Sequence, residues 1–91
     1  METSTGKPYT EIIGSGCIIR AFDSDVDEQD LVWHRDYHTR LITIDHANGW
    51  QFQFENELPF KLVDGMIFLV ERETYHRLIK GTGQLILKIR E

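Results

Sequence analysis

Four side chains that could do chemistry lie in one short stretch of the chain, between residues 31 and 40. Alternate positions carry two imidazoles, a carboxylate and a guanidinium: His34, Asp36, His38 and Arg40. Successive side chains of a β-strand point to opposite faces, so these four would share one face. Ile42 and Ile44 continue the alternation, which predicts that this face points inward unless a bulge near Thr39 reverses it. Such a row makes a poor hydrophobic core but a good site for a metal ion or an anion.

Short β-type segments separated by turns run through the rest of the chain. We expect strands over residues 9–13, 17–22, 31–40, 39–45, 50–55, 60–63, 66–70, 75–80 and 84–90. Asn48-Gly49 is a strong hairpin signal, and Gly81 to Gly83 predict another turn. The continuous apolar run Met66–Val70 predicts a strand covered on both faces. No segment has a convincing helical period, so the pattern predicts an all-β sandwich or barrel.

Size and charge narrow the class of protein. The chain has 91 residues and a net charge of -5, which argues for one domain and against general binding to nucleic acid. No apolar run is long enough for a transmembrane helix. The N-terminus lacks a signal-peptide pattern, and the single cysteine, Cys17, cannot form an internal disulfide. We therefore expect a cytoplasmic protein with a flexible N-terminal arm over residues 1–8 and one barrel domain over residues 9–91.

The small size of the chain also bears on its oligomeric state. A domain of this length buries only a modest core, so association is a source of further burial. The apolar strands between Tyr9 and Phe22 could pair across a two-fold axis. We therefore expect a homodimer.

Two spacings in the chain resemble the motifs of the cupin family of small jelly-roll barrels. The second cupin motif reads G-x5-P-x-G-x2-H-x3-N. Gly65 and His76 keep its spacing, whereas Glu71, Glu73 and Lys80 stand at its proline, second glycine and asparagine positions. The first motif reads G-x5-H-x-H-x3-4-E-x6-G. There, His34-Arg-Asp36 stands at H-x-H, Arg40 stands at the glutamate, and Gly49 lies close to the closing glycine. The resemblance covers residues 16–91 and implies a double-stranded β-helix barrel.

This resemblance also implies a metal site, because cupins of this type bind a divalent metal through the motif histidines and glutamate. His34 and His76 keep ligand chemistry, and Asp36 can also ligate, whereas Arg40 cannot because its guanidinium stays cationic. Two histidines and one carboxylate favour Fe(II), with Mn, Ni or Zn as alternatives. His38 is either a fourth ligand or an alternative to Asp36.

The remaining departures from the motifs suggest a ligand. Arg40 and Lys80 would place positive charge beside the metal, which suits a small carboxylate or phosphate molecule. The alternatives are that both are surface cations, or that Arg40 neutralises Asp36. Trp50 and Phe52 could form an apolar wall of the ligand site, or could be ordinary core residues.

Three functions therefore compete. The first is a metal-dependent cupin enzyme, a dioxygenase-like oxidoreductase or an isomerase, that acts on a small anionic organic molecule. The second is a cupin that binds such a molecule without catalysis or metal, and the third is a structural dimerisation module. Metal analysis separates the first from the other two, and a ligand-dependent melting shift without turnover would favour the second.

Overall fold

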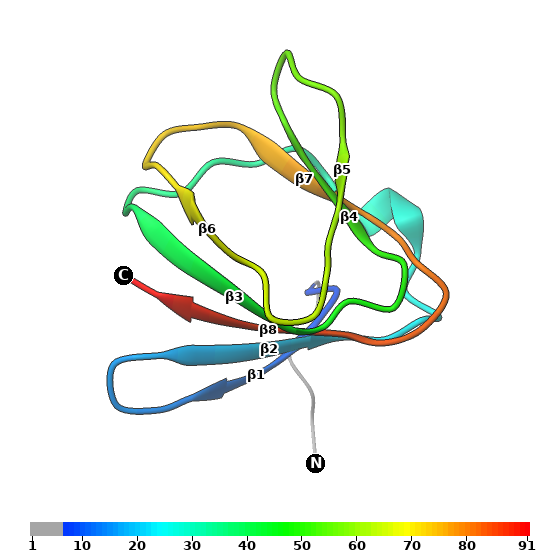
Figure 1. Cartoon of the computed structure of the whole chain (residues 1–91), viewed down its shortest axis with the longest axis horizontal. Helices are drawn as coiled ribbons and strands as arrows, with labels where there is room; N and C mark the ends of the chain where they lie inside the picture. Colours follow the sequence, from blue (N-terminus) through cyan, green and yellow to red (C-terminus); the bar gives the residue numbers. More distant parts are fainter. Residues whose placement is uncertain (1–6) are drawn as a thin grey trace.

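The computed structural model describes residues 7–91 as two antiparallel sheets that face each other (Figure 1). The strands are β1 (Thr10–Ile13), β2 (Ile18–Phe22), β3 (Arg40–His46), β4 (Gln51–Phe54), β5 (Phe60–Lys61), β6 (Ile67–Val70), β7 (His76–Ile79) and β8 (Leu85–Arg90). The only helix within residues 7–91 is the short 3-10 turn η1 (Glu28–Asp30). The predicted all-β fold is confirmed. Most of the predicted arm, residues 1–6, lies outside the described residues.

The larger sheet has the strand order β1-β2-β8-β3-β6, and the smaller one has the order β5-β4-β7. Neighbours in the larger sheet come from distant parts of the chain, as β8 inserts between β2 and β3. No helix in the described part of the chain is long and apolar enough to cross a membrane.

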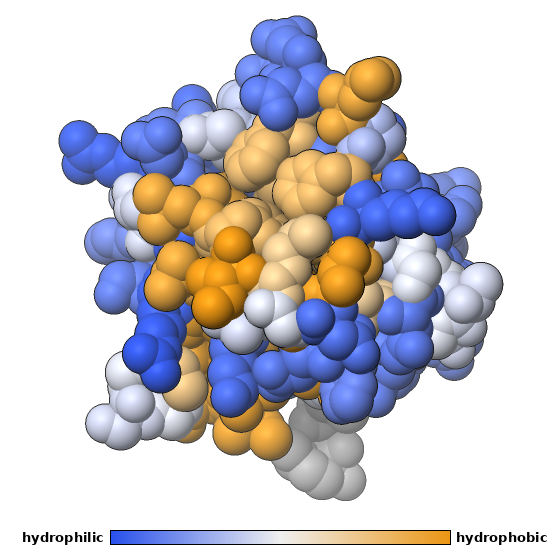
Figure 2. All heavy atoms as spheres, viewed as in Figure 1, coloured by the Kyte–Doolittle hydropathy of each residue, from blue (hydrophilic) through white to orange (hydrophobic). Residues whose placement is uncertain are grey.

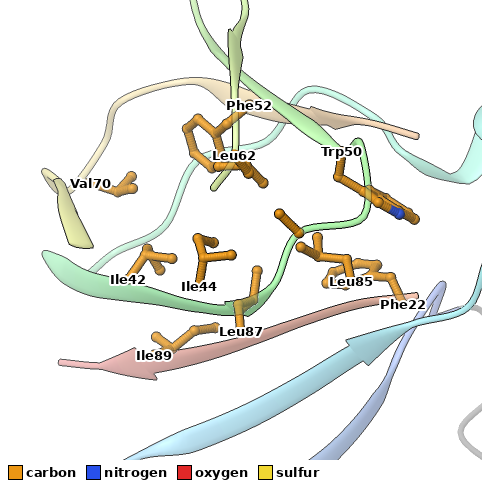
Figure 3. Close-up of a cluster of buried hydrophobic side chains, with 11 residues drawn as sticks. Phe22, Ile42, Ile44, Trp50, Phe52, Leu62, Val70, Leu85, Leu87 and Ile89 are labelled. Atoms are coloured by element: carbon orange, nitrogen blue, oxygen red, sulfur yellow. The ribbon is translucent and has the colours of Figure 1, made fainter. Parts of the chain in front are cut away.

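A core of apolar side chains fills the space between the sheets (Figure 3). Ile42 and Ile44 point inward from β3, and Leu85 and Leu87 do so from β8, following the period of two that each strand shows in sequence. Trp50 is 0% exposed, and its indole Nε1 donates a hydrogen bond to the carbonyl oxygen of Gly83 at 2.7 Å. Trp50 therefore ties β4 to the turn before β8.

The turn predicted before Trp50 is present, with Asn48 at φ 47° and Gly49 at φ 84°. It does not close the predicted hairpin, because the strands on either side of it, β3 and β4, belong to different sheets. It packs closely against the predicted second turn. A Cβ atom at Gly81 would lie 2.4 Å from both the carbonyl oxygen of Asn48 and the backbone nitrogen of Trp50. Only glycine allows the two turns to approach this closely.

Two further sequence predictions are wrong in detail. The run over residues 66–70 is not covered on both faces, because Ile67 and Leu69 point away from the core and are 61% and 53% exposed. Figure 2 shows apolar side chains gathered at the surface over the region of β5 and β6. The predicted strand over residues 31–40 is also absent as a strand. Only Arg40 belongs to β3, and His34 makes an isolated bridge to His76.

The segment before β3 is irregular for a physical reason. Its alternation places polar groups on one face and Trp33 and Tyr37 on the other, and both aromatic residues are exposed. Neither face can therefore bury itself as the inner face of a strand does. The segment is held by its backbone: His34 and His76 exchange hydrogen bonds of 3.0 and 2.9 Å, and the Glu73 amide donates to the Asp36 carbonyl at 2.8 Å.

Candidate metal centre

Those backbone contacts bring three potential metal ligands together. His34 and Asp36 come from the irregular segment, and His76 begins β7. One imidazole nitrogen from each histidine and one carboxylate oxygen all lie within 4.8 Å of one another. Two atoms bound at about 2.1 Å to one tetrahedral ion lie about 3.4 Å apart. The group would therefore have to close by up to about 1.4 Å to reach coordination distance.

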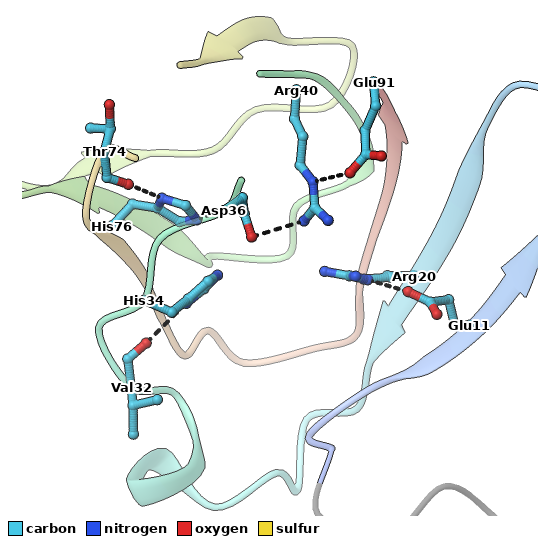
Figure 4. A network of polar contacts seen from close by, with 9 residues as sticks. All are labelled: Glu11, Arg20, Val32, His34, Asp36, Arg40, Thr74, His76 and Glu91. Carbon is cyan, nitrogen blue, oxygen red and sulfur yellow. Dashed lines mark hydrogen bonds and ion pairs between the residues drawn. The ribbon is translucent and has the colours of Figure 1, made fainter. Parts of the chain in front are cut away.

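In both histidines, a contact between Nδ1 and a backbone carbonyl oxygen orients the ring (Figure 4). His34 Nδ1 lies 3.1 Å from the carbonyl oxygen of Val32, and His76 Nδ1 lies 2.8 Å from that of Thr74. A carbonyl oxygen only accepts, so Nδ1 must carry the proton in both rings. In the neutral rings the lone pair is then on Nε2, the arrangement that metal-binding histidines use.

A neighbouring aromatic ring and a neighbouring arginine hold His76 and Asp36 in place. The Phe52 ring stacks on the His76 ring at a centroid distance of 5.3 Å and an angle of 14°. Asp36 divides its two oxygens between neighbours: Oδ1 lies 3.2 Å from Nη1 of Arg40, and Oδ2 lies 3.4 Å from Nε2 of His76. Arg40 in turn donates from Nε to Glu91 at 2.8 Å. One oxygen of Asp36 is thus held in place while the other remains directed at the histidines.

The protonation states also suit a metal ion. His34 is an exposed residue, but partial burial of its imidazole lowers its pKa, assisted by the charges of His76 and Arg20 and opposed by the backbone bond to Val32 and the charge of Asp36. Burial alone would raise the pKa of Asp36, but the interaction of its carboxylate with the His76 ring and the charge of Arg40 outweigh it and lower this pKa. At neutral pH the centre therefore offers a neutral His34 and an ionised Asp36, and both can ligate.

The three residues line a cavity of about 350 Å³ between the sheets. This volume is at the lower end of the range for small-molecule sites. Apolar side chains form much of the wall, among them Leu31, Leu78 and Leu87. Two arginines, Arg20 and Arg40, also line it.

Comparison with known proteins identifies the architecture. Neither a family model nor a curated protein matches the chain in sequence. A cupin-2 domain protein from Shewanella frigidimarina matches in structure with a TM-score of 0.64 and 13% identity, covering 91% of this chain and 78% of that one. A chain from the structures of the DMSP lyases RdDddP and RnDddQII matches with a TM-score of 0.68 and 14% identity. This chain has the cupin fold.

The third match is hydroxypropylphosphonic acid epoxidase from S. wedmorenis, with a TM-score of 0.65, 14% identity and 91% of this chain covered. The present chain spans 49% of that epoxidase and 46% of the lyase chain. These identities are low, so the similarity concerns the fold.

The cupin motif positions meet at one site, but not every predicted residue joins it. His34, Asp36, His76, Arg40 and Phe52 all line the cavity. His38 is exposed and lies outside the three-residue group. Lys80 does not line the cavity either, and Trp50 lies in the core instead. The predicted pairing of Arg40 with Asp36 is present, so the structure favours this alternative over Arg40 as a free anion anchor.

Sequence reasoning missed Arg20, which lines the cavity from β2. A signal was available: Ile18 and Phe22 share its face of the strand, and both contribute to the core cluster. An arginine between two inward-facing apolar residues indicates a charged group directed into the barrel. The carbonyl oxygens of Val32 and Thr74 have no such signature, because any residue could supply them.

Proposed function

We propose that this protein is a cupin that binds one divalent transition metal through His34, Asp36 and His76, and that holds a small anionic organic molecule in the adjoining cavity. The observation that carries the proposal is the shared orientation of the histidines. Each Nδ1 is hydrogen-bonded to a backbone carbonyl oxygen, which leaves the lone pair of Nε2 to bind a metal ion at the centre.

The donor set favours a particular group of metals. Two imidazoles and a carboxylate suit Fe(II), Mn, Ni or Zn more than calcium, which takes six or more oxygens. Three protein ligands leave positions open for a substrate, and Fe(II) with this set supports oxygen chemistry. HppE, a solved structure that this chain resembles in fold with a TM-score of 0.66 and 14% identity, was solved with Fe(II) and with Co(II). We therefore propose Fe(II) as the resident metal, and a dioxygenase-like reaction as the activity to test first.

The cavity supports the second half of the proposal. It adjoins the metal ligands, has room for a small molecule, and combines apolar walls with arginines. Bound metal would supply a positively charged centre to which an acid group or another oxygen donor could be attached. The protein's own residues would position the ligand and keep bulk water away from its apolar part. A cytoplasmic location remains a prediction.

Elemental analysis of tag-free protein purified without chelators tests the metal site. We expect about one transition metal ion per chain in the wild type, and loss of the ion in His76→Ala. Removal of a direct ligand should weaken affinity by more than about 100-fold, since outer contacts alone are typically worth 10–100-fold.

His46→Ala and His38→Ala are the matched controls, because both remove exposed histidines outside the group. Both should retain the metal. Equal metal content in the wild type and His76→Ala would refute the site. Loss of metal in His38→Ala would show that the ligand set is wrong.

A further inference from the structure

Arg20 faces the candidate metal ligands from the other sheet. It lies in the middle of β2, whereas His76 begins β7 in the smaller sheet, and both line the same cavity. Figure 4 shows its guanidinium reaching toward the space bordered by His34, Asp36 and Arg40. The side chain is 16% exposed, so it is largely enclosed by the barrel.

The guanidinium is held in a fixed orientation. Its Nε donates to Glu11 of β1, and its plane lies over the Tyr9 ring, with Cζ 4.3 Å from the ring centroid. Within residues 7–91, no hydrogen bond or ion pair engages its two terminal amino groups. Arg40 differs, because one of its terminal amino groups already pairs with Asp36. Arg20 therefore presents a two-pronged donor whose orientation is set before any ligand arrives.

The charges around the cavity leave room for one anionic group. The lining cations are Lys7, Arg20 and Arg40, and the lining carboxylates are Asp30 and Asp36. Glu11 and Glu91 add one negative charge each through their arginine partners. With a bound dication, five positive charges face four negative ones, so a monoanion would balance the site.

The apolar lining defines the rest of the ligand. The cavity wall formed by Leu31, Leu78 and Leu87 is apolar and offers no hydrogen-bond partner to a polar ligand atom. We propose that Arg20 binds the carboxylate of a small monocarboxylic acid, whose short apolar body contacts this wall. The charge balance rests on the proposed metal function, but the contact between Arg20 and a carboxylate can be measured without it.

Calorimetric titration of butyrate into protein loaded with Zn, which is redox-inert, tests the assignment. We expect butyrate to bind at least 10-fold more tightly than butyramide, which has the same shape without the charge. Arg20→Met should lose at least 10-fold in butyrate affinity. Arg20→Lys keeps the charge and loses the two-pronged donor, so its affinity for butyrate should lie between those of the wild type and Arg20→Met.

Arg77→Met is the matched control. Arg77 also bonds through Nε to a side chain, Gln53 at 2.8 Å, and lies over an aromatic ring, Trp33 at 4.8 Å, but it does not line the cavity. It should leave butyrate affinity unchanged. If Arg20→Met does not fold, a loss of at least threefold in Arg20→Lys supports the assignment, and no loss overturns it.

Three results would overturn the inference: equal butyrate affinity in the wild type and Arg20→Met, equal binding of butyramide, or tighter binding of inorganic phosphate than of butyrate. Metal analysis of Arg20→Met separates this inference from the proposed function, because the variant should keep its metal. Binding of butyrate that depends on Arg20 in a protein without metal would support the inference while the proposed function fails.

Discussion

Arg40 holds one carboxylate oxygen of Asp36 and leaves the other for the histidines. Nη1 of Arg40 lies 3.2 Å from Oδ1, while Oδ2 lies 3.4 Å from Nε2 of His76. Glu91 holds Arg40 from behind at 2.8 Å. Arg40, which aligns with the glutamate position of the motif that the sequence resembles, thus contacts the candidate metal centre through Asp36.

Replacement of Arg40 should therefore weaken metal binding without removing it. For Arg40→Met we expect a loss of about 10–100-fold in metal affinity, the usual effect of an outer contact on a ligand. Competition with a chelator measures the change. Arg35→Met, which removes an exposed arginine paired with Glu73 at 3.4 Å, is the control and should have no effect. Unchanged metal affinity in Arg40→Met, with a lost response to anions, would instead make Arg40 the anion anchor.

Phe52 should couple stability to the metal site, because it belongs to the core and also stacks on His76. We expect Phe52→Leu to lower the free energy of unfolding by about 1–2 kcal/mol through lost packing. It should also weaken metal binding, since the His76 ring loses the surface that orients it. Urea unfolding and chelator competition measure the two effects. Leu62→Ala, a core change outside the cavity, should lower stability with no effect on metal affinity.

The extent to which the sequence predicts this structure depends on what holds each segment. Arg40, Ile42 and Ile44 follow the predicted alternation, because β3 has a buried face that a shift of one residue would expose. His34 and Asp36 reach the cavity although their strand is absent, since backbone bonds to the 71–76 segment position them. Residue types do not reveal such bonds, because almost any residue can supply the backbone groups that form them. Motif spacing identified His76, whereas Arg20 lies outside both motifs and was indicated only by the apolar residues Ile18 and Phe22 on its face of β2.

The close approach of the two turns at Gly81 should be visible in stability. An added Cβ atom would meet backbone atoms at 2.4 Å, so the turns would have to separate. We expect Gly81→Ala to be destabilising by about 1–3 kcal/mol, as for other changes that force backbone shifts in packed regions. Gly14→Ala is the control, because its Cβ would meet its nearest neighbour at 3.7 Å. Equal unfolding free energies for the two variants in urea would contradict the close approach.

Association of two chains through β1 remains a prediction. β1 is the edge of the larger sheet and exposes Ile12 and Ile13, so a second copy could pair with it across a two-fold axis. We expect dimers in sedimentation at micromolar concentration, and monomers for Ile12→Lys. Leu58→Lys, at an exposed site away from β1, should leave the dimer intact. A monomeric wild type would exclude this interface.

Acid should destabilise the metal-free protein through two groups at the same site. The pKa of His34 is lowered chiefly by burial, so the folded state resists a proton that the unfolded state accepts below about pH 6.5. His76 and Arg40 lower the pKa of Asp36 against the effect of burial. The ionised carboxylate therefore stabilises the folded state above the pKa that Asp36 has in the unfolded chain, and this stabilisation is lost as the pH falls through its pKa in the folded state. Both shifts have the same sign, because the unfolded state binds more protons in each window.

We therefore expect the unfolding free energy, measured in urea with a chelator present, to fall as pH decreases from about 6.5 and to fall again below about 4. His34→Gln removes the first group and should flatten the first decline while it leaves the second. His46→Gln, which removes an exposed histidine outside the cavity, should keep both. A wild-type profile that rises between pH 6.5 and 5 would show that His34 gains a proton on folding, which would be incompatible with a neutral, metal-ready imidazole at this position.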